Sequence, residues 1–418
     1  METGEHVGDA QRVVVPVGML LAAALIVVAG WMFKAHCYVD GAWHGGEQYT
    51  TGCYTDVVPF WTIREVSAGA VPYLDSALEY PVLTGAQIWF EGAVARALVG
   101  STGSASVFLT AVTLVNGALA LGILAVLARI GVPHRRLWWW ALAPPLVLYV
   151  GHNWDLLAMF LLMVAIAGHQ RGRALSAGIA VGLGTAAKLF PGLALPLFAL
   201  AHLRRGAVAD VTRLLGGAAG AWLVVNVPVA IVAFEPWAEF YTFSSERLGT
   251  FAASWTVAAE LDLVHTSVAQ RNLWGAVAFA VGAVAIVAIG WARHAGREWV
   301  LLTPLIAWFL LTSKVYSPQF DLWLMPLLVA TSRRTWPLAA FVVTDALVYL
   351  TEFWYLGFRA GYSPSAPYPA LAGAAVLRAL VLVCIIVLAV RDRAPAWTAT
   401  SRASSPVDDA TAVGADSR

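Results

Sequence analysis

Apolar runs of about twenty residues are the feature that most limits how this chain can fold. The clearest cover residues 13–33, 214–234, 273–292 and 371–390. A helix rises about 1.5 Å per residue, so each run can cross a hydrocarbon core of about 30 Å. Hydrophobic residues make up 60% of the 418 residues and charged residues only 12%, more apolar surface than a water-soluble fold could bury. The sequence therefore predicts an all-α, polytopic integral membrane protein.

Arginines cluster in the short breaks between the apolar runs. The clusters are Arg129/Arg135/Arg136, Arg171/Arg173, Arg204/Arg205/Arg213, Arg293/Arg297, Arg333/Arg334 and Arg391/Arg393. By the positive-inside rule these breaks are cytoplasmic, which requires about 12 crossings of the plasma membrane with both termini inside. The other breaks then face the extracytoplasmic side, among them a large first loop at about 34–101. We expect one membrane domain over 1–394 and a disordered cytoplasmic tail over 395–418.

Three of the expected hairpins are short. They pair 137–150 with 156–169, 175–187 with 189–202, and 299–312 with 322–331. An arm of about 14 residues spans only about 21 Å, less than the hydrocarbon core. The hairpin tips are therefore predicted to lie below the outer surface, where polar backbone is tolerated if it lines a wet cavity. The alternative is a helix extended by an interfacial turn, or a locally thinner bilayer.

The loop at 34–101 is dense in aromatic and polar residues, which indicates a folded element resting on the membrane. Its segment 86–99 is apolar but carries Glu91 and Arg96, as expected of an amphipathic helix in the interface plane. Cys37 and Cys53 both lie in this loop, where an oxidising compartment permits a disulfide. Their separation in space is not fixed by the sequence, so the pairing stays open.

Asp56 is the first candidate for chemistry in this loop. It is a lone carboxylate between Tyr54 and Trp61, and a positioned carboxylate can take a proton from an attacking hydroxyl. The alternative is a solvated loop acid. Glu79, followed by Tyr80, is either that base or a group that binds a sugar hydroxyl, unless it only braces the loop; we assign Glu79 and Tyr80 a supporting role at the substrate.

The hairpin tips hold the other candidates. His152, Asn153 and Asp155 fill the first tip, and ionisable groups near membrane depth are functional candidates because their desolvation is costly. Asn153 or Asp155 could instead only cap the helix that starts at residue 156. Lys188 interrupts the second hairpin, where it either holds a lipid phosphate or extends its ammonium to the interface.

The third tip combines a cation, hydroxyls and an amide in Lys314, Tyr316 and Gln319, a set suited to a phosphate or sugar. Lys314 could instead pair with Asp321 as a structural tie. Asp56, His152 and Asp155 could supply metal ligands, but no tight spacing demands a metal, so no cofactor is predicted. The net charge of +1 without a basic stripe excludes a nucleic-acid partner.

The order of these pieces resembles the GT-C glycosyltransferase superfamily, in particular glycosyltransferase family 87, which includes actinobacterial polyprenyl-phosphomannose-dependent mannosyltransferases. The resemblance covers residues 13–390. It rests on Asp56 after the first helix, Glu79-Tyr80-Pro81, Asn153-Trp154-Asp155, and the segments 187–191 and 314–319. By matching position it implies that Asp56 is the base and that Lys188 meets the donor phosphate. The first loop departs from the pattern by lacking a DxD pair, which leaves metal dependence in doubt.

The resemblance and the residues together predict a hexosyltransferase. A hexose such as mannose would move, with inversion, from a polyprenyl-phosphate donor to a lipid-linked or cell-envelope glycan on the extracytoplasmic side. The prenyl chain would stay in the membrane lipids. The rival predictions are a transporter or flippase of lipid-linked sugars, although no internal repeat is visible, and a catalytically silent subunit of an envelope complex.

Overall fold

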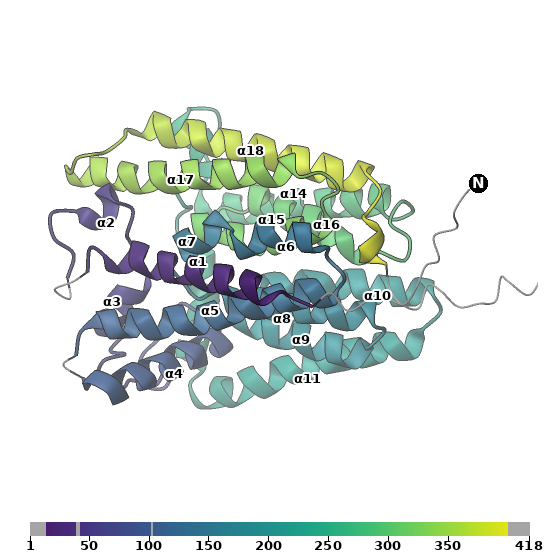
Figure 1. Ribbon diagram of the computed structural model, residues 1–418, viewed down its shortest axis with the longest axis horizontal. Helices are drawn as coiled ribbons and strands as arrows, with labels where there is room; N and C mark the ends of the chain where they lie inside the picture. Colours follow the sequence, from purple (N-terminus) through teal and green to yellow (C-terminus); the bar gives the residue numbers. More distant parts are fainter. Residues whose placement is uncertain (1–13, 39–41, 102, 400–418) are drawn as a thin grey trace, which may run out of the picture.

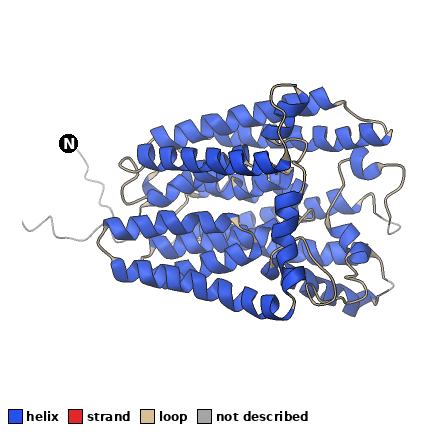
Figure 2. Ribbon diagram, turned by 180° about the vertical axis from the view of Figure 1, so that it is seen from behind, coloured by secondary structure: helices blue, strands red, loops and turns tan. Residues whose placement is uncertain are grey.

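The computed structural model describes residues 14–38, 42–101 and 103–399. Over these residues the fold is built from helices, and the only β-type pairing is an isolated bridge between Pro72 and Ser76. Most helices run along the long axis of the molecule, side by side (Figure 1), and the opposite view shows the same arrangement (Figure 2). The predicted all-α, polytopic membrane fold is confirmed.

Six helices in the described part of the chain are long and apolar enough to cross a membrane. They are α1 (Val17–Ala35), α5 (Ala105–Arg129), α11 (Val208–Val232), α14 (Val268–Gly290), α17 (Trp336–Ala360) and α18 (Tyr368–Arg391). The four apolar runs read from the sequence correspond to α1, α11, α14 and α18. The figure of about 12 crossings remains a prediction, because the shorter helices decide it.

The shorter helices build the first loop, the hairpins and their connections. The first loop holds α2 (Glu47–Thr50), α3 (Val57–Ile63) and α4 (Val82–Val99). The first two hairpins hold α6 (His134–Ala141), α7 (Pro144–Tyr149), α8 (Asp155–Gln170), α9 (Ala174–Ala187), η1 (Phe190–Leu193) and α10 (Ala194–Arg204). The remaining ones are α12 (Phe234–Glu246), α13 (Ser254–Glu260), η2 (Glu298–Leu301), α15 (Leu302–Thr312), η3 (Pro318–Trp323), α16 (Met325–Thr331) and η4 (Ala396–Thr398).

The hairpin helices are short and form the centre of the molecule. Helix α9 has 14 residues and α15 has 11, so they span roughly 21 Å and 17 Å. Their tips carry buried side chains, including Trp154 and Trp323, which are 0% and 5% exposed. These tip residues therefore lie inside the protein, and the depth of the tips below the outer membrane surface stays a prediction.

Small residues set the depth of the second hairpin. A Cβ on Gly178 or Gly182 of α9 would lie 2.1 Å or 2.3 Å from the carbonyl oxygens of Leu214 and Ala218 on α11. Two glycines four residues apart thus allow the backbones of the two helices to touch, a packing mode common in membranes. This contact fixes α9 and so the position of Lys188 at its end.

Helix α4 corrects one expectation about the first loop. The amphipathic segment predicted at 86–99 is helical but starts earlier, at Val82, and packs against α5 and α9. Its acid Glu91 is 0% exposed and accepts hydrogen bonds from Gln87 and Trp154, and Arg96 donates to the carbonyl of Val66. The polar side chains of α4 point into the protein rather than toward water, because buried partners satisfy them.

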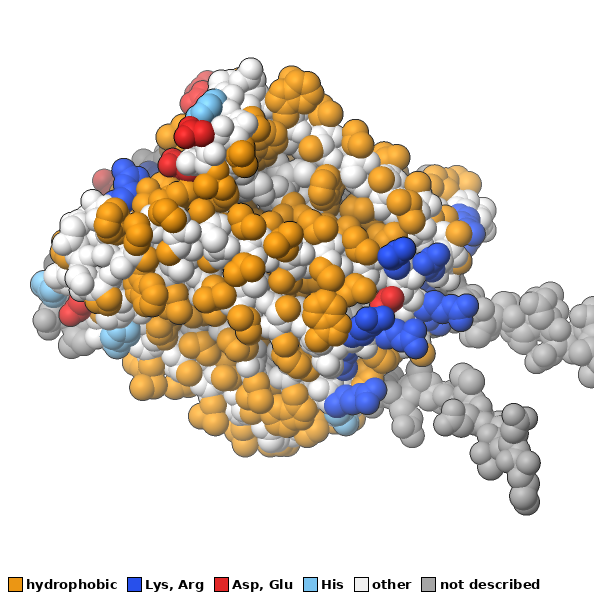
Figure 3. Space-filling view, turned by 90° about the horizontal axis from the view of Figure 1, so that it is seen from above, with side chains coloured by type: hydrophobic (Ala, Val, Ile, Leu, Met, Phe, Trp, Pro, Cys, Tyr) orange, Lys and Arg blue, Asp and Glu red, His pale blue; other side chains and the backbone are white. Residues whose placement is uncertain are grey.

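The arginine-rich breaks meet at one end of the bundle. Arg136 donates to the carbonyl of Arg334, Arg171 to that of Arg129 and Arg293 to that of Arg391. Arg205 pairs with Glu298, and Arg334 with Asp392. In Figure 3 the Lys and Arg side chains gather densely at one end of the displayed face, beside a broad apolar belt. A dense cluster of positive charge at one side of an apolar belt is typical of a membrane-embedded bundle that follows the positive-inside rule.

The tail expected to be disordered from 395 onward begins with ordered structure. Residues 396–398 form η4, and Thr398 is fully buried. Its carbonyl accepts hydrogen bonds from Trp299 and Gln170, which ties these residues to the arginine-rich end. The expectation was therefore wrong for 395–399, because tertiary partners supply the contacts that the local sequence lacks. Residues 400–418 lie outside the described part of the chain.

Candidate active site

The hairpin tips and the first loop open onto one cavity of about 760 Å³, at the end of the bundle opposite the arginine-rich breaks. Helices α12, α14, α15 and α17 complete its wall. Of the site residues predicted from the sequence, those on the wall are Asp56, Glu79, Tyr80, His152, Asn153, Lys188, Lys314 and Gln319. Asp155 and Tyr316 do not line it. The fold thus brings together candidates spread over more than 260 residues of sequence.

Asp56 is held by the first hairpin tip. Its backbone N–H donates to the carbonyl of His152 over 3.0 Å, and its Oδ2 accepts from Asn153 Nδ2 over 2.7 Å. Asn153 also donates to the Tyr80 hydroxyl over 2.9 Å. Beside it, the buried Thr55 hydroxyl donates to the carbonyl of Gly151 over 2.7 Å. Backbone and side-chain contacts together aim one carboxylate at the cavity and fix its position.

Burial raises the pKa of Asp56 above its ordinary value. Hydrogen bonds from Asn153 and Tyr54 and the positive charge of Lys188 act in the opposite direction but do not outweigh it. The negative charge of Asp56, followed by burial, raises the pKa of the Tyr54 phenol, so this hydroxyl keeps its proton. A partly desolvated carboxylate with a raised pKa is more basic than one in water and suits proton abstraction.

Lys188 lies at the cavity but its charge is already matched. Its ammonium pairs with Asp155 Oδ1 over 2.5 Å and lies over the rings of Tyr80, Phe320 and Trp323. Asp155 also accepts from Trp323 Nε1 over 2.8 Å. Asp155 is therefore the counter-ion of Lys188, not a helix cap, and Lys188 does not extend to a membrane surface. The pair joins the first and second hairpin tips.

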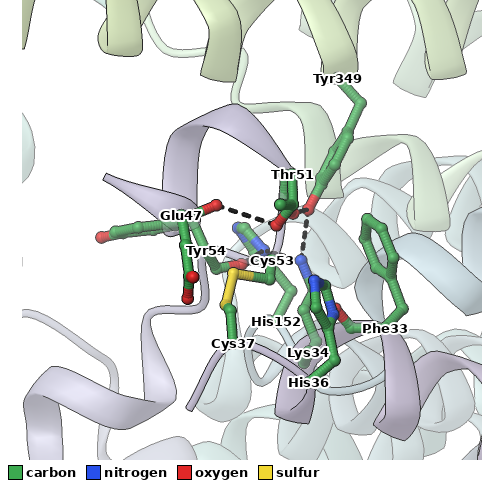
Figure 4. Close-up of a disulfide and its surroundings, with 11 residues drawn as sticks. Phe33, Lys34, His36, Cys37, Glu47, Thr51, Cys53, Tyr54, His152 and Tyr349 are labelled. Carbon is green, nitrogen blue, oxygen red and sulfur yellow. Dashed lines mark hydrogen bonds between the residues drawn. A yellow bond between two sulfur atoms is a disulfide. The ribbon is translucent and has the colours of Figure 1, made fainter. Parts of the chain in front are cut away.

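Behind Asp56, the buried Lys34 joins three segments (Figure 4). Its Nζ donates to the carbonyl of Tyr54 over 2.7 Å and to the Tyr349 hydroxyl, and it lies 3.1 Å from His152 Nδ1. His152 Nδ1 also lies 3.1 Å from the carbonyl of Tyr54, so Lys34 and this carbonyl meet at the same ring nitrogen. Lys34 thereby ties the backbone next to Asp56 to the ring of His152 and to Tyr349.

The same close-up shows the disulfide between Cys37 and Cys53, with Cα atoms 6.6 Å apart (Figure 4). The pairing that the sequence left open is therefore present. It links the end of α1 to the segment that carries Asp56, because Cys53 precedes Asp56 by three residues. Lys34 and the disulfide hold the same short stretch of backbone from two sides.

Some residues of the third tip line the cavity, and others pack behind the cavity wall. Lys314 and Gln319 line the cavity, whereas Tyr316 is 2% exposed and donates to Asp321. Asp321 pairs with Arg378, whose guanidinium stacks 3.6 Å from the Tyr316 ring centre. The alternative tie between Lys314 and Asp321 is therefore wrong, because Arg378 is the partner of Asp321 and Lys314 turns to the carbonyl of Ser245.

Of the three roles that the sequence left open for Glu79, the structure contains the brace, and its role as base or sugar-binding group stays a prediction. Glu79 forms an ion pair with Arg64 over 2.7 Å, which braces the first loop, and it also lines the cavity. The groups predicted as possible metal ligands do not form a cluster. His152 Nδ1 faces Lys34, Asp155 is paired with Lys188, and the one group of close metal-ligating side chains among the described residues is His36, Cys37 and Cys53, two of which are the disulfide.

Sequence reasoning missed several residues on the wall. Arg247, Arg271 and Glu352 line the cavity, and the buried Glu91 supports Trp154 from behind. The two arginines had a visible signal, since they stand in a break assigned to the outer side, where the positive-inside rule expects few. Glu352 and Glu91 had no such signal in the sequence, because an acid within an apolar helix can face the protein interior or its surface.

Comparisons with known proteins give one match. The family model described as glycosyltransferase family 87 matches residues 81–318, more than half of the chain. The matched interval contains the three hairpin tips up to Pro318, whereas Asp56, Glu79 and Tyr80 lie before it. No curated protein and no solved structure matches the chain.

Proposed function

The chain belongs to glycosyltransferase family 87 and is a membrane glycosyltransferase, and we propose that it transfers a hexose such as mannose from a polyprenyl phosphate to an envelope glycan. The observation that carries the proposal is the placement of Asp56. It faces a cavity whose wall also holds cations, sugar-binding polar groups and apolar side chains from α12 and α14. A donor with a sugar, a phosphate and a prenyl chain requires all three kinds of surface.

In the proposed reaction the acceptor hydroxyl attacks the anomeric carbon from the side opposite the phosphate. Asp56 takes the hydroxyl proton while the new C–O bond forms and the bond from carbon to phosphate oxygen breaks. Polyprenyl phosphate leaves with the bonding electrons, so the anomeric configuration inverts. Cations on the cavity wall stabilise the negative charge that grows on the leaving phosphate.

Polar neighbours would orient the sugar. Asn153 already donates to Asp56 and Tyr80, and His152 lies on the same wall, where its ring can meet a sugar hydroxyl. Gln319 and Glu79 add an amide and a carboxylate to the same wall. We propose that the active site faces the extracytoplasmic side of the plasma membrane, because the arginine-rich breaks lie at the other end of the bundle.

The test is a transfer assay with purified protein in lipid nanodiscs, radiolabelled polyprenyl-phosphate mannose and acceptor-containing membrane extract. The wild-type protein should form labelled glycolipid or glycan, and Asp56→Asn should lose activity by about 100-fold or more. The matched control is Asp75→Asn, an exposed acid of the same loop that should leave transfer unchanged. Near-normal transfer by folded Asp56→Asn would refute the assignment. Movement of lipid-linked sugar without a new glycosidic bond would favour the transporter instead.

A further inference from the structure

Three cations from three different elements converge on one side of the cavity. Arg247 follows α12, Arg271 lies in the first turns of α14, and Lys314 follows α15. Lys314 Nζ donates to the carbonyl of Ser245 over 2.7 Å. A Cβ placed on Gly249 would lie 2.7 Å from the Lys314 carbonyl oxygen and 3.5 Å from Arg271 Nη1, so the three chain segments meet here.

None of these three side chains has a carboxylate within ion-pair distance in the part of the chain that the structure describes. Arg271 Nε donates to the Thr266 hydroxyl over 3.1 Å, and Lys314 donates to a carbonyl. Burial and the charges of Arg247 and Arg271 lower the pKa of Lys314. The fold holds three cations close together although they repel one another and lack an ion-pair partner. A bound anion would relieve this repulsion, so the cluster is suited to bind one.

This arrangement contrasts with that of Lys188, which the sequence had assigned to the donor phosphate. Lys188 has Asp155 at 2.5 Å as its counter-ion, so a phosphate would have to compete with a carboxylate already in place. Arg247, in contrast, has no ion-pair partner among the described residues, and its charge interacts at longer range with Asp56, Glu79 and Tyr80. An anion bound to Arg247 would therefore lie beside the proposed base.

Apolar side chains continue the wall away from the cations. They are Phe240 and Phe243 of α12, Gly275, Ala276 and Phe279 of α14, and Phe309 of α15. Helix α14 is poorly covered by the rest of the protein, with Val281 and Val284 66% and 69% exposed. A ligand that spans from the cations along this wall reaches the lipid-facing side of the bundle, so the fitting ligand has a phosphate head and a hydrocarbon chain.

We propose that Arg247, Arg271 and Lys314 bind the phosphate of a lipid substrate whose chain leaves over the phenylalanines of α12 and α14. The inference rests on the proposed function for the identity of that substrate, but phosphate binding itself is measurable without sugar transfer. Lys188 then acts as a positioning residue that ties two hairpin tips together, and the three unpaired cations take the charge of the leaving group.

The binding experiment uses the full chain in phosphatidylcholine nanodiscs with farnesyl phosphate as the probe and farnesol as its uncharged analogue. Arg271→Gln and Lys314→Met should each weaken binding of farnesyl phosphate by about 10- to 100-fold, since each removes one charge-assisted contact. Binding of farnesol should not change, which also shows that the variants are folded. The matched control is Arg359→Gln, an exposed arginine at the same end of the bundle that stacks on Phe251 away from the cavity.

Wild-type affinity in the double variant Arg271→Gln/Lys314→Met would overturn the proposal, as would an equal loss in Arg359→Gln. The transfer assay then identifies the source of the phosphate. A rise in KM confined to the polyprenyl-phosphate sugar assigns the site to the donor, and a rise confined to the glycan lipid assigns it to a phosphorylated acceptor. If the variants lose phosphate binding but the wild-type protein transfers no sugar, the proposed function fails and the phosphate site stands.

Discussion

The two ends of the bundle use positive charge in different ways. At the arginine-rich end, side chains such as Arg293 and Arg297 donate to the carbonyls of Arg391 and Ala394, and Arg205 pairs with Glu298. At the cavity end stand all three lysines of the chain, one buried behind Asp56, one paired with Asp155 and one unpaired on the wall.

The cations at one end orient the protein in the membrane, whereas those at the other end hold or line the candidate active site. Arginines that close helix ends and meet water need only lie on the right side of the membrane, and any of several neighbours can satisfy them. A cation that is buried in the bundle is poorly hydrated, so its charge must be stabilised by a specific protein partner or by a ligand. The cavity end is therefore the more sensitive of the two to substitution.

The largest effect concerns which side of the membrane each end faces. In a Cys384→Ala background, Ser365→Cys marks the cavity end and Arg333→Cys marks the arginine-rich end, and both positions are exposed. An impermeant maleimide on intact cells should label Ser365→Cys completely and Arg333→Cys only after permeabilisation, as the positive-inside rule requires. The reverse pattern would break the comparison and place the cavity in the cytoplasm.

A smaller effect is expected from the buried cation behind Asp56. Lys34→Met leaves the Tyr54 carbonyl and the Tyr349 hydroxyl without their shared donor, and each loss costs about 1–3 kcal/mol; it also removes the contact with His152 Nδ1. We expect kcat for sugar transfer to fall by about 10- to 100-fold with little change in KM, because Asp56 and His152 lose their positions while the wall of the cavity stays.

The matched change at the other end is Arg136→Met. Arg136 is also buried, at 4% exposure, and donates to the carbonyl of Arg334. It should lower the thermal unfolding midpoint but leave kcat per folded molecule unchanged. If the two substitutions reduced kcat equally, Lys34 would have only a structural role.

The smallest effect concerns a buried acid at each end. Burial raises the pKa of Glu91 from its ordinary 4.5 to about 7, against the hydrogen bonds from Gln87 and Trp154. Because the folded state holds this proton more tightly than the unfolded state, the group favours folding below pH of about 4.5, and that contribution is lost as pH rises through about 7. The stability of Glu91→Gln should therefore not fall with the titration of this group. At pH of about 8 its thermal unfolding midpoint should be higher than that of the wild type.

Glu298 is the control for Glu91 because Arg205 and the backbone N–H of Gly296 bind its carboxylate. Glu298→Gln removes an ion pair, so it should lower the unfolding midpoint at neutral pH rather than raise it. Midpoints of the wild type and Glu91→Gln that stay parallel from pH of about 5 to pH of about 8 would show that Glu91 does not titrate in this range.

Much of the cavity end could be anticipated because its residues carry local signals. Asp56 is the lone acid of an aromatic segment, and His152, Asn153, Lys188 and Gln319 interrupt apolar hairpins. Since the hairpin arms are too short to cross the membrane, their tips had to be buried, and buried polar residues had to find partners. The positive-inside rule placed these side chains on one side of the membrane, and the structure places them on one cavity.

The partners themselves could not be predicted. Asp155 binds Lys188, Asp321 binds Arg378, and Lys34 meets Tyr54, His152 and Tyr349 across as many as 315 residues. Such contacts depend on helix rotation and depth, and helix depth in turn depends on close approaches such as that of Gly178 to Leu214. A sequence shows that a polar group needs a partner, but not which one.

The sequence by itself determined that the chain is a helical membrane protein with arginine-rich breaks and polar, short hairpins, because hydrophobic length and charge are local properties of the chain. The tertiary structure alone decided that Lys188 forms an ion pair with Asp155 while Arg247, Arg271 and Lys314 have no ion-pair partner among the described residues. Whether a cation is free to bind substrate depends on which carboxylate lies within a few ångströms of it, and only the packed helices set that distance.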